Sequence, residues 1–386
     1  MASYIRRRKF LATLLGGAVV WPCDATCLPA LVTDRAVEAW YDPLHCMNDP
    51  QPEGHMASHI ERRKFLATLG GAAAAWPLAA RAQQPAMPVV GFLGAPSAAP
   101  YTRYVAAVHQ GLKEVGYIEH QNVTMEYRWA DGQYDRLPAM AADLVSRRVA
   151  VIVPIGGAPA TMAAKAATST IPIVFNLGAD PIQLGLVANL NRPGGNITGI
   201  AMMTQEIEGK RLELLHELAP SSSSIAILLN PSNAQAQAQE SQAHAAARVI
   251  GRRVLVLKAA TEHEIEDAFA VLARERAGAL LVGADTFFLS QATLFVVLTA
   301  RYSVPTIYTF RAYVDAGGLM SYGSNLLDAY RQTGVYTGRV LKGEKPADLP
   351  IVQPTKFELI INLKTARAVG IAIPPTLVAR ADEVIE

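Results

Sequence analysis

Cysteine is absent from most of this 386-residue chain. Its three cysteines, Cys23, Cys27 and Cys46, all precede Met56, and none follows. The long part of the chain therefore contains neither a disulfide bond nor a cysteine-bound metal. The spacing Cys-x3-Cys at Cys23 and Cys27 is loosely compatible with metal binding, but no strand or helix pattern surrounds it that could hold a metal. We expect no metal site.

An excess of charge of one sign is also absent. The chain has 35 Lys and Arg residues against 33 Asp and Glu residues, for a formal net charge of +2. A nucleic-acid-binding surface would instead have clustered basic residues. After residue 82 no apolar run reaches the roughly 20 residues that a membrane-spanning helix needs. We expect no nucleic-acid partner and no membrane span in this part.

Familiar catalytic motifs are missing as well. The chain has no Gly-x-Ser-x-Gly elbow, no His-Glu-x-x-His pair and no Gly-x-x-x-x-Gly-Lys-Ser/Thr loop. The first predicted strand is followed by GAPSAAP, which lacks the glycine pattern of a dinucleotide site. We therefore predict a protein without cofactor that is not an enzyme. The alternative is an exported α/β enzyme that acts on a small metabolite.

What the N-terminal region does have is one segment in two copies. MASYIRRRKFLATL at residues 1–14 returns as MASHIERRKFLATL at residues 56–69, with two differences. Only the second copy is followed by a small-residue cleavage pattern. The simplest interpretation is that Met56 is the true start and that residues 1–55 are a duplicated or mis-called leader, expected to be disordered.

The second copy has the three parts of an export signal. The basic residues 62–64 precede an apolar stretch of about a dozen residues, and Ala80-Arg81-Ala82 then offers a cleavage site. We predict that residues 56–82 are a signal peptide, cut after Ala82, that sends the protein to the periplasm. The paired arginines resemble a twin-arginine signal, and the general secretion route stays open. The alternative, an amphipathic helix of the folded protein, would have a poor core face.

From Val89 on, short apolar runs alternate with helical segments of ten to fifteen residues. Such alternation indicates βαβ units with parallel strands, and apolar runs without a period of two indicate sheets covered on both faces. Two series of this kind, over residues 89–200 and 224–310, predict an α/β fold with two doubly wound parallel-sheet lobes.

The C-terminal elements are surplus to both series. A strand at GGLMSYGSN, a helix over 326–342 and a strand over 357–363 remain. They fit if the chain returns to the first lobe and then to the second. We predict residues 86–201 plus 317–345 as the first lobe and residues 202–316 plus 346–386 as the second. The three crossovers would form a hinge near residues 201–204, 315–318 and 344–350.

Ligands of open parallel sheets bind beyond the carboxyl ends of the strands. There, Gly156, Gly157 and Ala158 open a predicted helix whose N–H groups suit a carboxylate, although the glycines could serve only a tight turn. Asp285 ends another strand and could meet a positive group of the ligand. We expect Asp285 to lie in a turn at the rim of the sheet, where its removal leaves folding intact because such a turn carries little core packing.

Asp180 is a further candidate partner for a ligand amine, although Asp-Pro is also an ordinary helix start. Tyr308 could line the pocket or belong to the core. The remaining candidates stand at or near the ends of other predicted strands: Ser97, Asn230, Thr286 and Tyr322.

Three segments resemble a known family: FNLGADPIQLGLVANLNRPGGNITGI, NPSNAQAQAQ and FELIINLKTARAVGIAIPPTLVARADEVIE. They are similar to ABC-transporter substrate-binding proteins related to the tryptophan/tyrosine-binding type, over roughly residues 87–386. The resemblance implies the periplasmic binding protein type I fold, with two α/β lobes, three crossovers and a ligand cleft. It also implies a monomer that captures an amino acid or a similar small carboxylate-bearing ligand and delivers it to an ABC permease and its ATPase.

A third possibility is the effector domain of a sugar-responsive repressor. That class of protein would need a helix-turn-helix before the first strand. The chain has the predicted export signal in that place.

Overall fold

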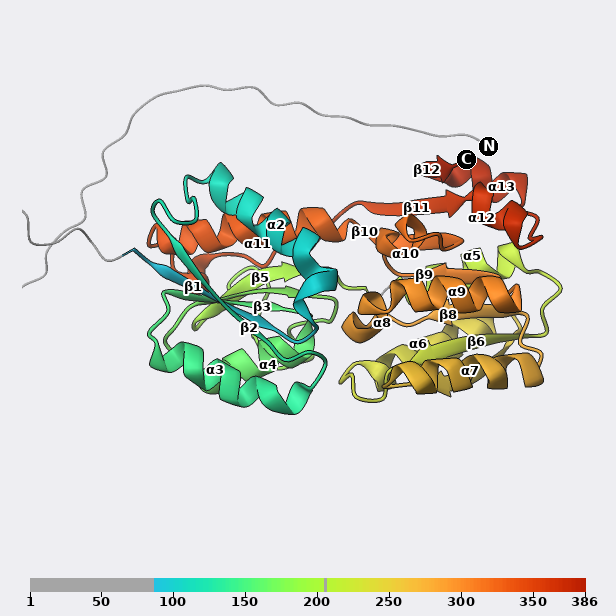
Figure 1. Ribbon diagram of the computed structural model, residues 1–386, viewed down its shortest axis with the longest axis horizontal. Coiled ribbons are helices and arrows are strands. Elements are labelled where there is room, and N and C mark those ends of the chain that lie inside the picture. Colours follow the sequence, from blue (N-terminus) through green and yellow to red (C-terminus); the bar gives the residue numbers. More distant parts are fainter. Residues whose placement is uncertain (1–86, 205–206) are drawn as a thin grey trace, which may run out of the picture. The chain divides into compact units, whose positions relative to one another are not determined.

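The computed structural model describes residues 87–204 and 207–386 (Figure 1). The two leader copies, the three cysteines and the predicted cleavage site lie outside these ranges. None of the helices in the described ranges is both long and apolar enough to cross a membrane.

The first lobe contains a five-stranded parallel sheet with the order β2-β1-β3-β4-β5. Its strands are β1 (Val89–Gly94), β2 (Thr124–Trp129), β3 (Val151–Ile155), β4 (Ile173–Leu177) and β5 (Ile197–Ala201). Its helices are α2 (Ala98–Glu114), η1 (Tyr134–Arg136), α3 (Leu137–Ser146), α4 (Ala158–Ala167), α11 (Leu326–Leu341) and η2 (Pro346–Asp348).

The second lobe contains a seven-stranded sheet with the order β12-β11-β10-β9-β8-β6-β7, in which only β10 and β11 pair antiparallel. Its strands are β6 (Ser224–Leu229), β7 (Arg253–Lys258), β8 (Ala279–Val282), β9 (Thr306–Tyr308), β10 (Met320–Ser324), β11 (Phe357–Asn362) and β12 (Glu383–Ile385). Its helices are α5 (Glu208–Leu218), α6 (Ala236–Val249), α7 (Glu262–Arg274), α8 (Thr286–Ser290), α9 (Ala292–Tyr302), α10 (Arg311–Asp315), α12 (Leu363–Ala368) and α13 (Pro375–Arg380).

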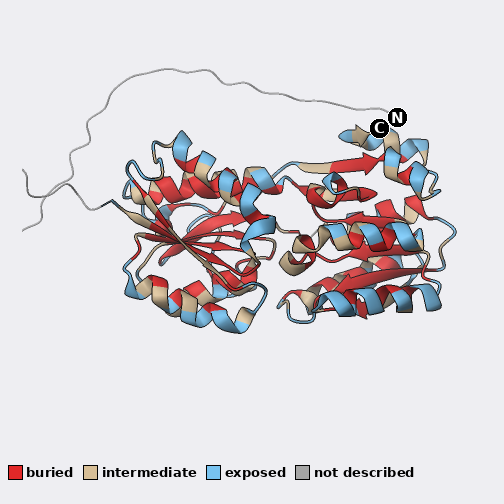
Figure 2. Cartoon of the chain, viewed as in Figure 1, coloured by how far each residue is buried: buried red, intermediate tan, exposed pale blue. Residues whose placement is uncertain are grey.

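Both faces of the first sheet are covered, as the apolar runs predicted. Every residue of β3 and β4 is buried (Figure 2). Side chains alternate between the faces of a strand: Val151 and Val153 belong to the core cluster with α2 and α11, whereas Ile152 belongs to the cluster with α3 and α4. The sheet is therefore the middle layer of three.

The strand β10 corrects the predicted lobe boundaries. We predicted residues 317–345 in the first lobe, but Ser321 pairs with Tyr308 of β9 and with Ile360 of β11, so β10 belongs to the second sheet. A period of two predicts a strand without saying which sheet it joins. Only α11 and the segment up to Val352 return to the first lobe.

The segment after α11 also stays with the first lobe for longer than predicted. Val352 forms a bridge beside β5, donating its N–H to the Gly199 carbonyl at 3.0 Å and accepting from the Ala201 N–H at 2.9 Å. The three crossovers therefore lie between β5 and α5, between β10 and α11, and between Val352 and β11. The predicted segment 201–204 overlaps the start of the first crossover, whereas the predicted crossovers at 315–318 and 344–350 are wrong.

The helices α2 and α11 pack backbone against backbone. A Cβ atom built on Gly111 would lie 1.9 Å from the Arg331 carbonyl oxygen, and one built on Gly334 would lie 2.0 Å from the Val108 carbonyl oxygen. Only glycine permits this approach. The returning helix α11 is thereby fixed against α2 (Figure 1).

An ion pair is fully buried at the start of α5, directly after the first crossover. Glu208 and Arg211 are both 0% exposed, and Arg211 Nη1 lies 3.2 Å from Glu208 Oε2. Arg211 also donates to the Thr309 hydroxyl at 2.8 Å and to the Thr204 carbonyl. Burial raises the pKa of Glu208 and lowers the pKa of Arg211, while their mutual attraction opposes both shifts.

Candidate ligand-binding site

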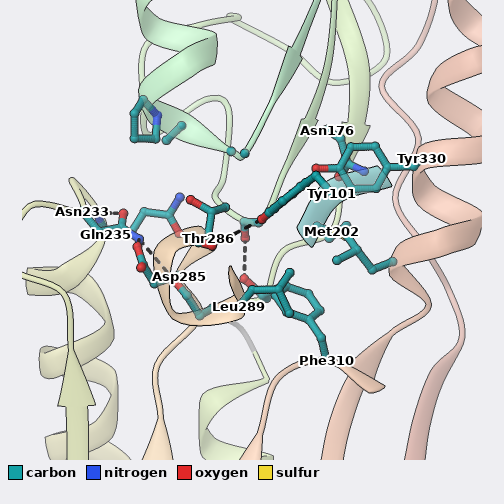
Figure 3. A pocket seen from close by; sticks show the side chains of 18 residues that line it. Tyr101, Asn176, Met202, Asn233, Gln235, Asp285, Thr286, Leu289, Phe310 and Tyr330 are labelled. Atoms are coloured by element: carbon teal, nitrogen blue, oxygen red, sulfur yellow. Dashed lines mark hydrogen bonds between the residues drawn. The ribbon is translucent and has the colours of Figure 1, made fainter. Parts of the chain in front are cut away.

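A pocket lies where the carboxyl ends of strands from both sheets meet (Figure 3). It encloses about 490 Å³ of space between atoms, part of it open to solvent. The first lobe contributes Tyr101, Gly156, Gly157, Ala158, Pro159, Asn176, Gly178, Met202, Thr204, Leu326 and Tyr330. The second lobe contributes Asn233, Gln235, Ala284, Asp285, Thr286, Leu289 and Phe310.

Two contacts join the lobes at this pocket. The Tyr101 hydroxyl donates to the Thr286 carbonyl at 3.5 Å, and the Tyr134 hydroxyl lies 3.5 Å from the Thr286 hydroxyl. Burial raises the pKa of Tyr134 to about 12, so its hydroxyl stays protonated at neutral pH. The first turn of α8 is thus held against α2 and η1.

The predicted glycine turn lies in the pocket wall. Gly156 and Gly157 have φ angles of 92° and 79°, a left-handed conformation that glycine adopts without strain. Gly157 precedes the first residue of α4, Ala158, and the first N–H groups of a helix have no partner within it. Ala158 and Pro159 of the first turn of α4 line the pocket, and Pro159 has no N–H group.

Asp285 lies in the pocket wall, and its side chain is buried. Its side chain is the N-cap of α8, where Oδ1 accepts from the Phe288 N–H at 3.0 Å and from Asn230 Nδ2 at 3.1 Å. Oδ2 accepts from Asn233 Nδ2 at 2.9 Å. The residue is 6% exposed, and burial raises the pKa of Asp285 while these hydrogen bonds oppose the shift. The premise that this turn carries little core packing is wrong, because the buried carboxylate holds a helix start and two asparagines.

Asn230, another predicted ligand residue, is not among the residues that line the pocket. It is buried behind the pocket wall, and its side chain donates to Asp285. Asn230 thus orients the carboxylate. Thr286, the first residue of α8, does line the pocket, as predicted.

Two predicted residues of the first lobe lie away from this pocket. Ser97 precedes α2 and lines a separate hollow with Tyr134 and Phe287. Asp180 accepts a hydrogen bond from the Ile182 N–H at 2.8 Å and begins a turn, whereas its alternative interpretation was the start of a helix.

The two predicted tyrosines of the second lobe also lie elsewhere. Tyr308 is fully buried, stacks on Tyr313 with ring centroids 4.4 Å apart, and lies 3.2 Å from the Thr299 hydroxyl. Tyr308 is therefore a core residue, which is the second of the two roles that the sequence left open. Tyr322 lies in β10 and packs near Phe357, with ring centroids 6.1 Å apart.

Sequence reasoning missed Asn176 and the aromatic residues of the pocket. Asn176 is a polar residue at the carboxyl end of the otherwise apolar run IPIVFN, which could have marked it. Tyr101, Tyr330 and Phe310 gave no comparable signal. They come from helices and a turn that reach the pocket only through the tertiary arrangement.

Charge in the pocket is confined to one place. Among the described residues that line it, none is Lys, Arg or His, and Asp285 is the single carboxylate. The positive end of the α4 dipole faces the same space. Within the described ranges, no group of His, Cys, Asp and Glu could hold a metal ion.

Two doubly wound α/β lobes, joined by three crossovers with a pocket between them, define a binding protein of the periplasmic binding protein type I fold. The sequence model of the ABC transporter substrate binding protein family matches residues 89–385. The chain belongs to this family, which consists of solute-binding proteins rather than enzymes.

Known relatives agree with this assignment. The tyrosine-binding protein of Clostridioides difficile strain R20291 is 26% identical over 259 residues, which cover 67% of this chain and 74% of the relative. A conserved domain protein of Vibrio cholerae has a TM-score of 0.71 and 26% identity, over 77% of this chain and 99% of that one. The structure of an ABC domain from Streptococcus pneumoniae in complex with L-Trp has a TM-score of 0.70 and 27% identity, over the same shares.

Proposed function

We propose that this protein is the periplasmic solute-binding component of an ABC importer and that it captures an amino acid or a similar carboxylate-bearing compound in the inter-lobe pocket. The observation that carries the proposal is the pairing of two features in one pocket wall. The first turn of α4 suits a carboxylate, and Asp285 suits an ammonium group. The tyrosine-binding relative and the L-Trp complex support the same class of ligand.

The proposal includes export and delivery. The leader at residues 56–82 is removed after Ala82, and the monomeric protein presents its ligand to a permease driven by an ATPase. N-terminal sequencing of protein from the periplasmic fraction should begin at Gln83. A sequence that begins upstream of Met56 would contradict our interpretation of the repeat.

Asp285→Asn should weaken amino-acid binding by about 10- to 100-fold, because a charge-assisted hydrogen bond contributes roughly 1.5–3 kcal/mol. The asparagine keeps one oxygen for the Phe288 N–H, so the helix start survives better than in Asp285→Ala. A thermal-shift screen against amino acids and small carboxylates identifies the ligand, and calorimetry on the variant then measures the loss.

Asp180→Ala is the matched control for this experiment. It also removes a carboxylate that accepts a backbone N–H, but it does not line the pocket. It should lower the melting temperature and leave affinity unchanged. Wild-type affinity in Asp285→Asn would remove Asp285 from the site, and a screen without any amino acid or carboxylate ligand would overturn the proposed function.

A further inference from the structure

Asn176 has a buried side-chain amide without a partner. The residue is 2% exposed, and neither Nδ2 nor Oδ1 has a hydrogen-bond partner among the described residues. Buried polar groups are nearly always paired, because an unpaired one loses its hydration without compensation. A ligand with a hydrogen-bond donor and an acceptor would pair both atoms of the amide. A single group that can donate and accept, such as a hydroxyl, could do the same.

The backbone fixes the direction of this side chain. Asn176 pairs with Ile200 in the ladder between β4 and β5, so it cannot turn toward solvent without breaking the sheet. Its strand neighbours Phe175 and Leu177 belong to the core on the α3–α4 side, whereas Val174 belongs to the core with α2 and α11. Alternation therefore places Asn176 on the α2–α11 face, where it lines the pocket.

The surroundings of Asn176 are aromatic, apolar and uncharged. Figure 3 draws Asn176, Tyr101, Tyr330 and Met202 on one flank of the pocket and Asp285 on the other. The Tyr101 hydroxyl donates to the Thr286 carbonyl at 3.5 Å. A charged ligand group would be desolvated here without a counter-charge, which is unfavourable. A neutral polar group within an apolar ligand body fits.

We propose that Asn176 is a specificity-determining residue that binds a neutral hydrogen-bonding group on the ligand's side chain. The inference rests on the proposed function, since it places the charged amino-acid head at Asp285 and the first turn of α4. The side chain then enters the aromatic flank and meets the Asn176 amide. The ligand class is an aromatic amino acid with a ring hydroxyl or ring N–H, in preference to phenylalanine.

Calorimetry with matched pairs of probes tests the assignment. L-tyrosine is compared with L-phenylalanine, which lacks only the hydroxyl, and L-tryptophan with 3-benzothienyl-L-alanine, which lacks the ring N–H. In at least one pair the wild-type protein should prefer the polar member by about 5- to 150-fold, because the apolar member leaves the buried amide unpaired. In Asn176→Leu the ratio of the two affinities within a pair should be close to one, chiefly because the polar member binds more weakly.

Asn196→Leu is the control variant. Asn196 is also a buried asparagine of the first lobe, but its Nδ2 donates to the Thr168 and Ile171 carbonyls. This variant should have a lower melting temperature than the wild-type protein and the same ratio of affinities within each pair of probes. Asn176→Leu should keep its melting temperature in the absence of ligand, because no hydrogen bond is lost. A loss as large as that of Asn196→Leu would mean that the amide is already paired and would overturn the inference.

The remaining outcomes are distinct. Equal affinity within both pairs in the wild-type protein, or an equal loss for both members in Asn176→Leu, would assign Asn176 to the common amino-acid head and overturn the inference. Binding of a different amino acid, with all four probes silent, would overturn it and leave the proposed function standing. If no amino acid binds, the proposed function fails as well.

Discussion

Arg211→Leu is expected to lower the free energy of unfolding by about 3–5 kcal/mol, since removing one member of a buried ion pair leaves the other charge uncompensated. Glu208 would remain at the start of α5 without exposure to solvent. The Thr309 hydroxyl and the Thr204 carbonyl would lose a donor in addition. Urea denaturation followed by circular dichroism measures the change.

The loss of unfolding free energy in Arg211→Leu should depend on pH. Burial raises the pKa of Glu208, and without Arg211 nothing opposes that rise. A carboxyl whose folded-state pKa is raised contributes stability at low pH that is lost as pH rises through that pKa. The variant should therefore be closer to wild type near pH 5 than near pH 8. An equal loss of unfolding free energy at both pH values would show that a charged, buried Glu208 is not its cause.

Two variants on the same helix serve as controls. The double variant Glu208→Leu/Arg211→Leu should lose less stability than Arg211→Leu, because no charge remains buried. Lys210→Leu removes a member of the exposed Lys210–Glu213 pair, whose atoms are 2.8 Å apart. Such pairs contribute about 0–1 kcal/mol, so this variant should be close to wild type.

Gly334→Ala should destabilise the protein by about 3 kcal/mol, at the upper end of the cost of overpacking a core. The added Cβ would lie 2.0 Å from the Val108 carbonyl oxygen, so α2 and α11 must separate. The helical propensity of alanine acts in the opposite direction, by about 1 kcal/mol. Thermal and urea denaturation report the balance.

Gly209→Ala is the matched control, since Gly209 also lies within a helix but its added Cβ would meet only the Ala246 Cβ, at 3.8 Å. It should be neutral or slightly stabilising. If Gly334→Ala were as stable as Gly209→Ala, the close approach of α2 and α11 would be wrong.

The sequence predicted the elements of the lobes better than their allocation. The apolar runs of β3 and β4 predicted buried parallel strands, because a doubly covered strand has no polar face. The run MSYGS predicted a strand but not its partners, which are chosen by contacts distant in sequence.

The candidate site was likewise predicted only in part. The rule that ligands bind at strand ends led to Gly157 and Asp285, because both follow recognisable strands. The rule could not separate a residue that faces the pocket, such as Asp285, from one that closes its own turn, such as Asp180. Asn176 was missed because it lies within its strand, and Tyr330 because its helix reaches the pocket from another part of the chain.

The late return of α11 has a consequence for the order of folding during synthesis. The five strands of the first sheet have all been made by Ala201, yet α11, which covers one face of that sheet, follows the first five strands of the second lobe. Until α11 emerges from the ribosome, α2 alone covers that apolar face, and only in part. The first lobe therefore cannot complete its core before most of the second lobe exists, and neither lobe is a unit that could be cut from the chain and expressed alone.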